Sequence, residues 1–255
     1  SNISRTQPYS NYSFNFDSGN SEVIDITNNS IFNLGSSFSI SGWFNLDYSN
    51  STRGLISFDS SSTRGWFFYT LSGNEIRIFD GTNAFVLKTS YTTTGEWDNF
   101  IVTYDGSNLV FYINGAQEST QTVSVDLQTN GNNGQIGNNQ FLSGRFFDGK
   151  MSNIALFDRT LTEQEVLKIY NNGVTQDLQA TSTFSNNIVA WWPMDQHSSY
   201  FNGTNWVVRD LINGNDGGGI NTGGVEDLVG NAPGSDASGS GNNLAIADLK
   251  NNMYN

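Results

Sequence analysis

The sequence predicts an all-β protein, in which two antiparallel sheets pack as a sandwich, with one short helix and a Gly/Asn-rich C-terminal extension. Three observations predict this class. Short segments in which apolar and polar residues alternate follow one another at regular intervals, as half-buried strands do. Turn dipeptides such as Asp80-Gly81 and Asn114-Gly115 separate several of them. Aromatic residues, which favour strands, make up 13% of the 255 residues. Frequent turns between many short strands favour a sandwich over a parallel sheet.

The predicted strands share a pattern in which apolar residues tend to recur at every second position, so that one face of each strand is buried. The longest covers residues 38–46, with Phe38, Ile40 and Phe44 on one face and Trp43 on the other. In chain order the predicted strands are residues 12–16, 23–26, 38–46, 55–58, 66–70, 76–79 and 85–88, the two arms of a hairpin within 101–115, residues 134–138, and a segment that begins at residue 149.

One short helix is predicted after the last of these strands. Thr162 is a suitable N-cap, because its hydroxyl can accept a hydrogen bond from a free N–H group of the first turn. Glu165 follows three residues later and completes a capping box. The apolar face consists of Val166, Leu167, Ile169 and Tyr170. Gly173 is expected to end the helix.

The composition changes after this helix. Residues 1–175 are predicted to form the sandwich, and residues 176–255 an extension with one apolar strand at 188–194. That strand is expected to add to the sandwich. The remainder has too little apolar material for a core of its own. We expect it to wrap around the surface or to bind a partner.

The charge balance excludes several classes of partner. Lys and Arg total 11 against 24 Asp and Glu, which gives a formal net charge of −13. Nucleic acids and anionic membrane surfaces are therefore disfavoured. The absence of cysteine excludes disulfides and thiolate metal sites, and a single histidine, His197, excludes a histidine cluster for zinc. The sequence contains no apolar run of about 18 residues, which a membrane-spanning helix would need.

Four segments in a fixed order carry a family pattern. They are residues 38–44 (FSISGWF), Glu96-Trp97 with residues 101–115 (IVTYDGSNLVFYING), residues 134–138 (GQIGN), and the strand and helix of residues 149–173. Together they resemble the laminin-G-like, concanavalin-A-like jelly-roll superfamily, which includes the pentraxins. The resemblance implies a two-sheet, lectin-like jelly roll, and a binding protein more often than an enzyme.

Three further segments follow the helix: residues 190–194 (AWWPM), 201–206 (FNGTNW) and 213–217 (NGNDG). This order is similar to that of laminin-G-like structural proteins of marine bacteriophages. The resemblance implies a virion surface protein (a fibre, tail or capsid appendage) that binds host glycan or decorates the particle. Its partners would be other virion proteins or further copies of itself. The alternative is a carbohydrate-binding module that is secreted by a bacterium or carried on its surface.

The pentraxin resemblance also implies calcium binding. In that branch two loops supply the oxygen ligands, and they correspond here to residues 59–63 and 138–140. The expected ligands of one weakly bound Ca²⁺ are therefore Asp59, Asn138 and Asn139. Asp17 and Asp148 are the alternatives, because laminin-G-like domains often carry Asp at strand ends.

Saccharide binding usually combines an aromatic ring with hydrogen-bonding Asn, Asp and Gly residues. The predicted aromatic platforms are Trp66, Tyr91, Tyr200 and Trp206. The other tryptophans lie in apolar strand patterns and are predicted to belong to the core; they are Trp43, Trp97, Trp191 and Trp192. The sequence permits a glycan site without locating it.

Glycoside hydrolysis is the third alternative. It needs two carboxylates on the same face of a strand, as general acid and nucleophile or base. The nearest pair is Glu22 and Asp25, which are three residues apart and so face opposite sides of a strand. We therefore predict that the protein is not an enzyme.

Overall fold

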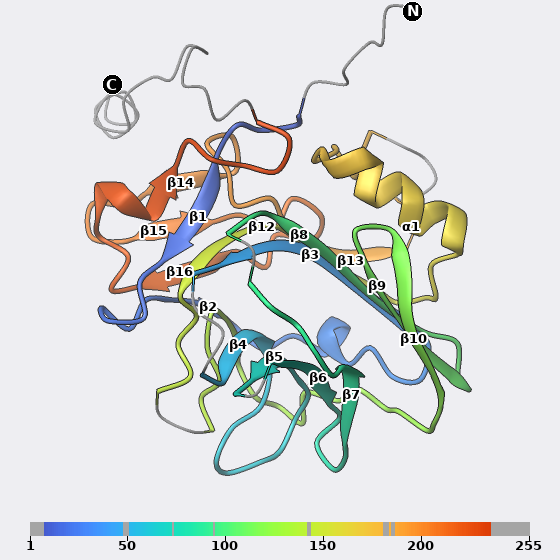
Figure 1. Cartoon of the computed structure of the whole chain (residues 1–255). Coiled ribbons are helices and arrows are strands. Elements are labelled where there is room, and N and C mark those ends of the chain that lie inside the picture. Colours follow the sequence, from blue (N-terminus) through green and yellow to red (C-terminus); the bar gives the residue numbers. More distant parts are fainter. Residues whose placement is uncertain are drawn as a thin grey trace, which may run out of the picture.

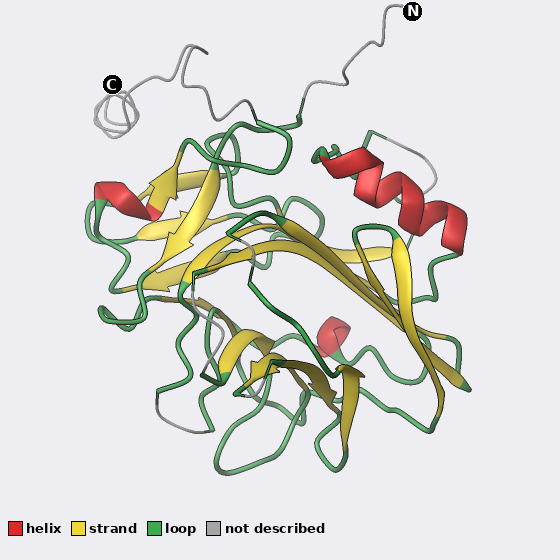
Figure 2. Ribbon diagram, in the orientation of Figure 1, coloured by secondary structure: helices red, strands yellow, loops and turns green. Residues whose placement is uncertain are grey.

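The computed structural model describes residues 8–47, 51–72, 74–93, 95–141, 144–180, 184 and 187–235. Two antiparallel sheets pack face to face, and a helix lies against the outer face of the first sheet (Figures 1 and 2). Within these ranges there is one α-helix, together with three short 3₁₀ turns. The prediction of an all-β sandwich with one short helix is confirmed.

The first sheet is built around β3 and β12, which pair with each other. Its strand order is β10 (Ala116–Thr122), β9 (Asn108–Ile113), β8 (Asp98–Tyr104), β3 (Phe38–Leu46), β12 (Gly149–Phe157), β1 (Ser13–Phe16) and β17 (Leu228–Val229). The far edge of β12 is shared, because β1 pairs with its first residues and β13 (Ile188–Trp192) with its last. This shared edge is where the extension joins the first sheet.

The second sheet also contains strands from both parts of the chain. Its order is β14 (Ser199–Phe201), β15 (Trp206–Val208), β16 (Gly217–Ile220), β2 (Val23–Ile26), β11 (Gly134–Ile136), β4 (Arg53–Ser57), β5 (Phe67–Leu71), β6 (Glu75–Phe79) and β7 (Ala84–Lys88). The β4–β5 loop and the β6–β7 turn lie at the lower edge of the molecule in Figure 1. The candidate site described below is built there.

Two hydrophobic cores hold the elements together. The main core lies between the sheets, where the ring of Trp192 lies 5.9 Å from that of Phe32. The second core lies between the outer face of the first sheet and the helix, and it contains Trp191. Successive side chains of a strand point to opposite faces, so the adjacent tryptophans of β13 enter different cores. One strand of the extension therefore contributes to both.

The helix, α1 (Glu163–Tyr170), has the predicted capping box. The Thr162 hydroxyl accepts from the Glu165 N–H at 3.3 Å, and the Glu165 carboxylate accepts from the Thr162 N–H at 2.8 Å. A hydrogen-bonded ion pair with Arg159 lowers the pKa of Glu165 to about 2. The helix ends before Gly173, because Asn171 already takes the left-handed conformation of a C-cap (φ 44°). No helix in the described part of the chain is long and apolar enough to cross a membrane.

The extension joins the sandwich at more places than the one strand predicted. β13 pairs with β12 in the first sheet, as predicted for residues 188–194, and β17 pairs with β1. β14, β15 and β16 continue the second sheet beyond β2. Up to residue 235, the extension is therefore part of both sheets, and it also supplies core residues.

Candidate functional site

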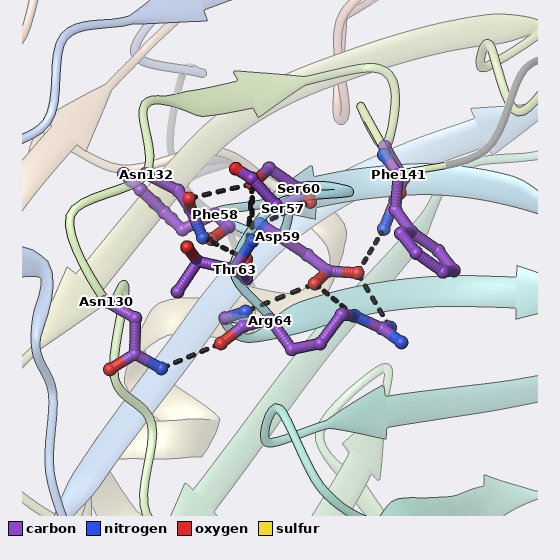
Figure 3. Close-up of polar contacts among 12 residues, drawn as sticks. Ser57, Phe58, Asp59, Ser60, Thr63, Arg64, Asn130, Asn132 and Phe141 are labelled. Atoms are coloured by element: carbon purple, nitrogen blue, oxygen red, sulfur yellow. Dashed lines mark hydrogen bonds and ion pairs between the residues drawn. The ribbon is translucent and has the colours of Figure 1, made fainter.

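A buried carboxylate organises the loop between β4 and β5. The side chain of Asp59 is fully buried, and Arg64 binds it with two hydrogen bonds (Figure 3). Arg64 Nε lies 2.7 Å from Asp59 Oδ1, and Arg64 Nη2 lies 2.9 Å from Asp59 Oδ2. The Gly65 N–H donates to the same Oδ1 at 3.1 Å. Bidentate pairs of this kind are stronger than neutral hydrogen bonds and fix the geometry of both groups.

The guanidinium of Arg64 also lies against two aromatic rings. Its central carbon lies 4.4 Å from the ring centroid of Phe79 in β6 and 3.9 Å from that of Phe141. Such contacts attract the cation to the ring face. Gly65 is needed beside it, because a Cβ there would collide with the carbonyl oxygen of Phe58. We call this arrangement of Asp59, Arg64 and the two rings the arginine clamp.

Hydrogen bonds from Asn130 and Asn132 stabilise the rest of the β4–β5 loop. The Asn132 amide donates to the carbonyls of Phe58 and Thr63, at 3.0 and 2.7 Å. Its own oxygen accepts from the Ser60 hydroxyl at 2.8 Å. The Asn130 amide donates to the carbonyl of Arg64 at 2.7 Å (Figure 3). The loop is therefore held in one conformation by the side chains of residues 130 and 132.

A polar pocket of about 360 Å³ opens beside Arg64. It lies between the β4–β5 loop, the β6–β7 turn and the segment of residues 124–130. We call it the loop pocket. It is lined by Arg64, Asp80, Gly81, Thr82, Asn83, Ser124, Asp126, Gln128 and Asn130.

The segment of residues 123–130 supplies one wall through a strict alternation. Val125, Leu127 and Thr129 are buried, and the bridge between Leu127 and Gly35 holds the segment extended. Side chains on an extended chain point alternately to opposite sides. The intervening residues Ser124, Asp126 and Gln128 therefore face the pocket, and Asn130, at a turn with a φ of 53°, completes this wall. The alternation in residues 123–130 is a signal by which the sequence could have located this wall.

The opposite wall is a turn fixed by its own carboxylate. Asp80 Oδ1 accepts from the N–H groups of Thr82 and Asn83, at 2.8 and 2.7 Å. Gly81 adopts a φ of +96°, which glycine tolerates without strain. The side chains of Thr82 and Asn83 stay exposed at the rim. The turn thus presents a hydroxyl and an amide toward the pocket on a rigid backbone.

The predicted calcium ligands lie together, but their oxygens are already engaged. Both carboxylate oxygens of Asp59 accept from Arg64, and Oδ2 also accepts from the Asn139 amide at 3.2 Å. The Asn139 oxygen accepts from the N–H of Phe141 at 2.7 Å. Asn138 contributes one buried oxygen that has no hydrogen-bond partner. Calcium takes six to eight oxygens, so these residues, as arranged, do not fit the ion.

The alternative ligands, Asp17 and Asp148, lie near each other. Asp148 Oδ1 accepts from the N–H of Ser18 at 3.3 Å, and Asp17 Oδ1 accepts from the N–H of Gly19 at 2.7 Å. Arg53 lies 3.8 Å from the other oxygen of Asp148. Among the residues that the structure describes, no three Asp, Glu, His or Cys side chains gather as a metal site would require. Calcium binding at this pair stays a prediction.

We expect the arginine clamp to make the loop independent of calcium. In the Asp148→Ala variant, which removes a ligand of the alternative site, neither EDTA nor millimolar CaCl₂ should shift the thermal unfolding midpoint, because Arg64 supplies the positive charge that Asp59 needs. Differential scanning fluorimetry in both conditions checks this. A ligand that binds only the folded state raises the midpoint in a concentration-dependent way. A midpoint that rises steadily with calcium concentration would contradict the expectation.

The structure corrects three of the four predicted aromatic platforms. Trp66 and Trp206 are 0% and 1% exposed, and their indole N–H groups donate to backbone carbonyls. Tyr91 is 4% exposed, and its hydroxyl donates to Asp98 at 2.9 Å; this burial raises the pKa of Tyr91. Such rings have no open face for a sugar. Tyr200 is half-buried, with the Arg209 guanidinium 5.2 Å from its ring centroid.

The candidate catalytic pair serves local structure. The buried carboxylate of Glu22 accepts from the N–H of Asp17 at 2.7 Å and from the Asn20 amide at 3.2 Å, which closes the turn before β2. Burial raises the pKa of Glu22. Asp25 accepts from the Gln135 amide of the neighbouring strand at 2.6 Å. Glu22 and Asp25 therefore both have structural hydrogen-bond partners.

The two-sheet sandwich, with polar loops gathered at one end, defines a lectin-like jelly roll. A family model described as the concanavalin A-like lectin/glucanases superfamily (Laminin_G_3) matches residues 17–167. The chain belongs to this superfamily. A comparison with curated proteins found no match.

Several solved structures are similar to this chain. A candidate carbohydrate-binding protein from Bacteroides ovatus matches 85% of this chain, with 18% identity and a TM-score of 0.65. This chain spans 59% of the length of that protein. The CBM40 of Ruminococcus gnavus IT-sialidase, bound to α2,3 sialyllactose, matches 63% of this chain and 99% of its own, with 10% identity and a TM-score of 0.51. A SAP-like pentraxin from Limulus polyphemus matches 62% of this chain and 80% of its own, with 14% identity and a TM-score of 0.46.

Proposed function

We propose that this protein binds a saccharide without catalysis, and that the loop pocket is the binding site. One observation carries the proposal. Hydroxyl, amide and carboxylate side chains from two chain segments, and the guanidinium of Arg64 from a third, converge on one pocket of about 360 Å³. The arginine clamp and the carboxylate of Asp80 hold two of these segments rigid. Preorganised polar groups lose less freedom on binding, which favours affinity.

The chemistry of the lining suits a ligand rich in hydroxyl groups. Carboxylates accept hydrogen bonds, amides both donate and accept, and hydroxyls do either. Asp126, Asn83 and Asn130 all have exposed side chains in this lining. A saccharide can pair with each of them through its hydroxyls. An apolar ligand would leave these groups without partners, at a cost of about 1–3 kcal/mol for each polar group that becomes buried.

Two features support binding without hydrolysis. One carboxylate oxygen of Asp80 accepts hydrogen bonds from two backbone N–H groups, as is typical of an aspartate that stabilises a turn. Asp126 accepts from the Gln128 amide at 2.8 Å and is exposed. A glycosidase keeps one of its two carboxyl groups protonated as the general acid, through burial or a neighbouring charge. Neither aspartate in the loop pocket is buried in this way.

A glycan array probed with the full chain tests the proposal. We expect binding to a defined set of saccharides. The Asn83→Ala and Asp126→Ala variants should each weaken it roughly tenfold, the effect of losing about 1.4 kcal/mol of hydrogen bonding. Asn108→Ala is the matched control, because Asp105 fixes the turn before Asn108 as Asp80 fixes the turn before Asn83. Equal weakening by Asn108→Ala, or none by either test variant, would contradict the proposed site.

We also propose where the protein acts. The resemblance to bacteriophage structural proteins supports a virion surface role in host attachment or particle decoration, with virion proteins or further copies of itself as partners. A secreted or surface bacterial carbohydrate-binding module is the alternative, and it would use the same pocket. Detection of this chain in purified virions by mass spectrometry separates the two. Its absence from virions that are otherwise complete would favour the bacterial module.

A further inference from the structure

A second pocket, of about 280 Å³, lies on the outer face of the first sheet near the C-terminal end of α1. We call it the aromatic pocket. It shares no residue with the loop pocket. It is lined by Trp43, Glu96, Trp97, Asn114, Tyr170, Gly173, Asn231, Ala232, Gly234 and Ser235.

Three aromatic rings form its apolar part. Trp43 belongs to β3 and, at 3% exposed, lies deepest. Tyr170 stacks on it, with ring centroids 5.9 Å apart and planes inclined by 27°. Gly115 allows the close approach of Tyr170, because a Cβ there would lie 2.9 Å from its ring. Trp97, predicted to be core, is instead half-buried and presents part of its surface to the pocket.

The extension completes the pocket. The Trp97 indole N–H donates to Asn231 Oδ1 at 3.1 Å, which ties the extension to the jelly roll. Residues 232–235 form a turn closed by the Ser235 hydroxyl, which donates to the Ala232 carbonyl at 2.7 Å. Gly234 packs so closely on Val174 that a Cβ would lie 2.8 Å from its side chain. This wall lies outside residues 17–167, which match the superfamily.

The charge of the lining narrows the ligand class. Glu96 is exposed, and among the described residues that line the pocket it alone has a side chain that is charged at neutral pH. No lysine or arginine accompanies it in that lining. The lining therefore offers no cation to pair with an anionic ligand, so the pocket favours a neutral or basic ligand. The rings would also attract a cation.

We propose that the aromatic pocket is a second saccharide site, which takes a neutral pyranose or a pyranose with an amino group. Such a ring has an apolar C–H face, which matches Trp97 and Tyr170. Its hydroxyl edge matches Asn231, Ser235 and Glu96. Ligand sites of this kind combine aromatic walls with a few polar groups. The inference stands on residues of its own and does not depend on the loop pocket.

The test measures how the full chain binds four probes: methyl α-glucoside, methyl β-galactoside, glucosamine and glucuronic acid. Saturation-transfer NMR detects contact, and a fluorescence change on binding that is lost in Trp97→Ala reports on Trp97 among the six tryptophans. We expect the neutral and amino sugars to bind more tightly than glucuronic acid. Trp97→Ala should weaken their binding roughly tenfold or more, as loss of a buried aromatic anchor does. Glu96→Lys, a change at the exposed rim, should shift the preference toward glucuronic acid.

Two control variants keep this inference separate from the proposed function. Asn108→Ala alters a turn that lines neither pocket and should leave binding unchanged, whereas Asn83→Ala alters only the loop pocket. If Asn83→Ala alone weakens binding, the proposed function stands and the aromatic pocket is overturned as a saccharide site. If only the Trp97 and Glu96 variants change binding, the aromatic pocket stands as a saccharide site and the loop pocket is overturned as one. If no probe binds, or if glucuronic acid is preferred by the unaltered chain, the inference is wrong.

Discussion

Replacing Arg64 with alanine is expected to lower the free energy of unfolding by about 3 kcal/mol, because it leaves a buried carboxylate without its counter-charge. Asp59 would keep the N–H of Gly65 and the Asn139 amide as donors, but it would lose both bonds to the guanidinium. The Arg64 side chain is 39% exposed, so water can reach part of the vacated space. We therefore expect the lower end of the range of about 3–5 kcal/mol for breaking a buried pair.

Equilibrium unfolding in urea measures this change through the shift of the midpoint. Arg77→Ala is the matched control, because Arg77 also pairs with a carboxylate, that of Glu75, but both side chains are about a quarter exposed. Surface pairs contribute about 0–1 kcal/mol. Similar effects of the two substitutions would show that the arginine clamp does not hold the loop. The loop pocket would then have no rigid support from the arginine clamp.

A chain that ends at Gly173 is expected to lose cooperative unfolding altogether. The truncation removes every strand from β13 to β17, and with them Trp191 and Trp192. Trp192 fills the main core beside Phe32, and Trp191 fills the second core beneath the helix. Replacing one buried Trp or Phe by alanine already costs about 3–5 kcal/mol, and whole domains are stable by only about 5–15 kcal/mol.

The control is a chain that ends at Ser235, which keeps all the described strands of both sheets. We expect it to unfold in one cooperative transition, with the near-ultraviolet circular dichroism of packed aromatic side chains. The chain that ends at Gly173 should lack that signal. If it folds instead as a stable monomer, the sandwich is complete within the first 173 residues. The strands of the extension would then be an addition that the fold does not need.

The main features of the fold could be predicted from the sequence because they depend on local patterns. Alternating apolar residues mark β1, β2 and β3, since the period of side chains along a strand is two. The capping box at Thr162 and Glu165 lies within four residues and needs no tertiary contact. The end of α1 was misplaced by two residues, because Asn171 adopts the left-handed conformation before Gly173 does.

The small strands of the extension could not be predicted in the same way. β14, β15 and β16 have only three or four residues each, and β16 is mostly glycine. Glycine is weak in strands by itself. In β16 it is required by contact, because a Cβ on Gly217 would collide with Ile24 of β2. That requirement appears only when two distant segments lie side by side.

The candidate site also has parts that could be predicted from the sequence and parts that could not. Which tryptophans are buried depends on packing between distant segments. The sequence predicts Trp66 as a sugar platform, but it belongs to the core. It predicts Trp97 as core, but Trp97 lines a pocket. Asp59 was read as a calcium ligand from a family resemblance. Its partner Arg64 lies five residues away in the same loop, and that nearby arginine was a signal for an internal ion pair.

We propose that the loop pocket binds a saccharide on a framework held by the arginine clamp rather than by a metal. Titration calorimetry measures this binding with the full chain, EDTA in the buffer, and the saccharide that binds best on the array. We expect saturable binding with EDTA present, weakened roughly tenfold by Asp126→Ala and unchanged by Asn108→Ala. Binding that disappears with EDTA and returns with calcium, or that ignores Asp126→Ala, would contradict it.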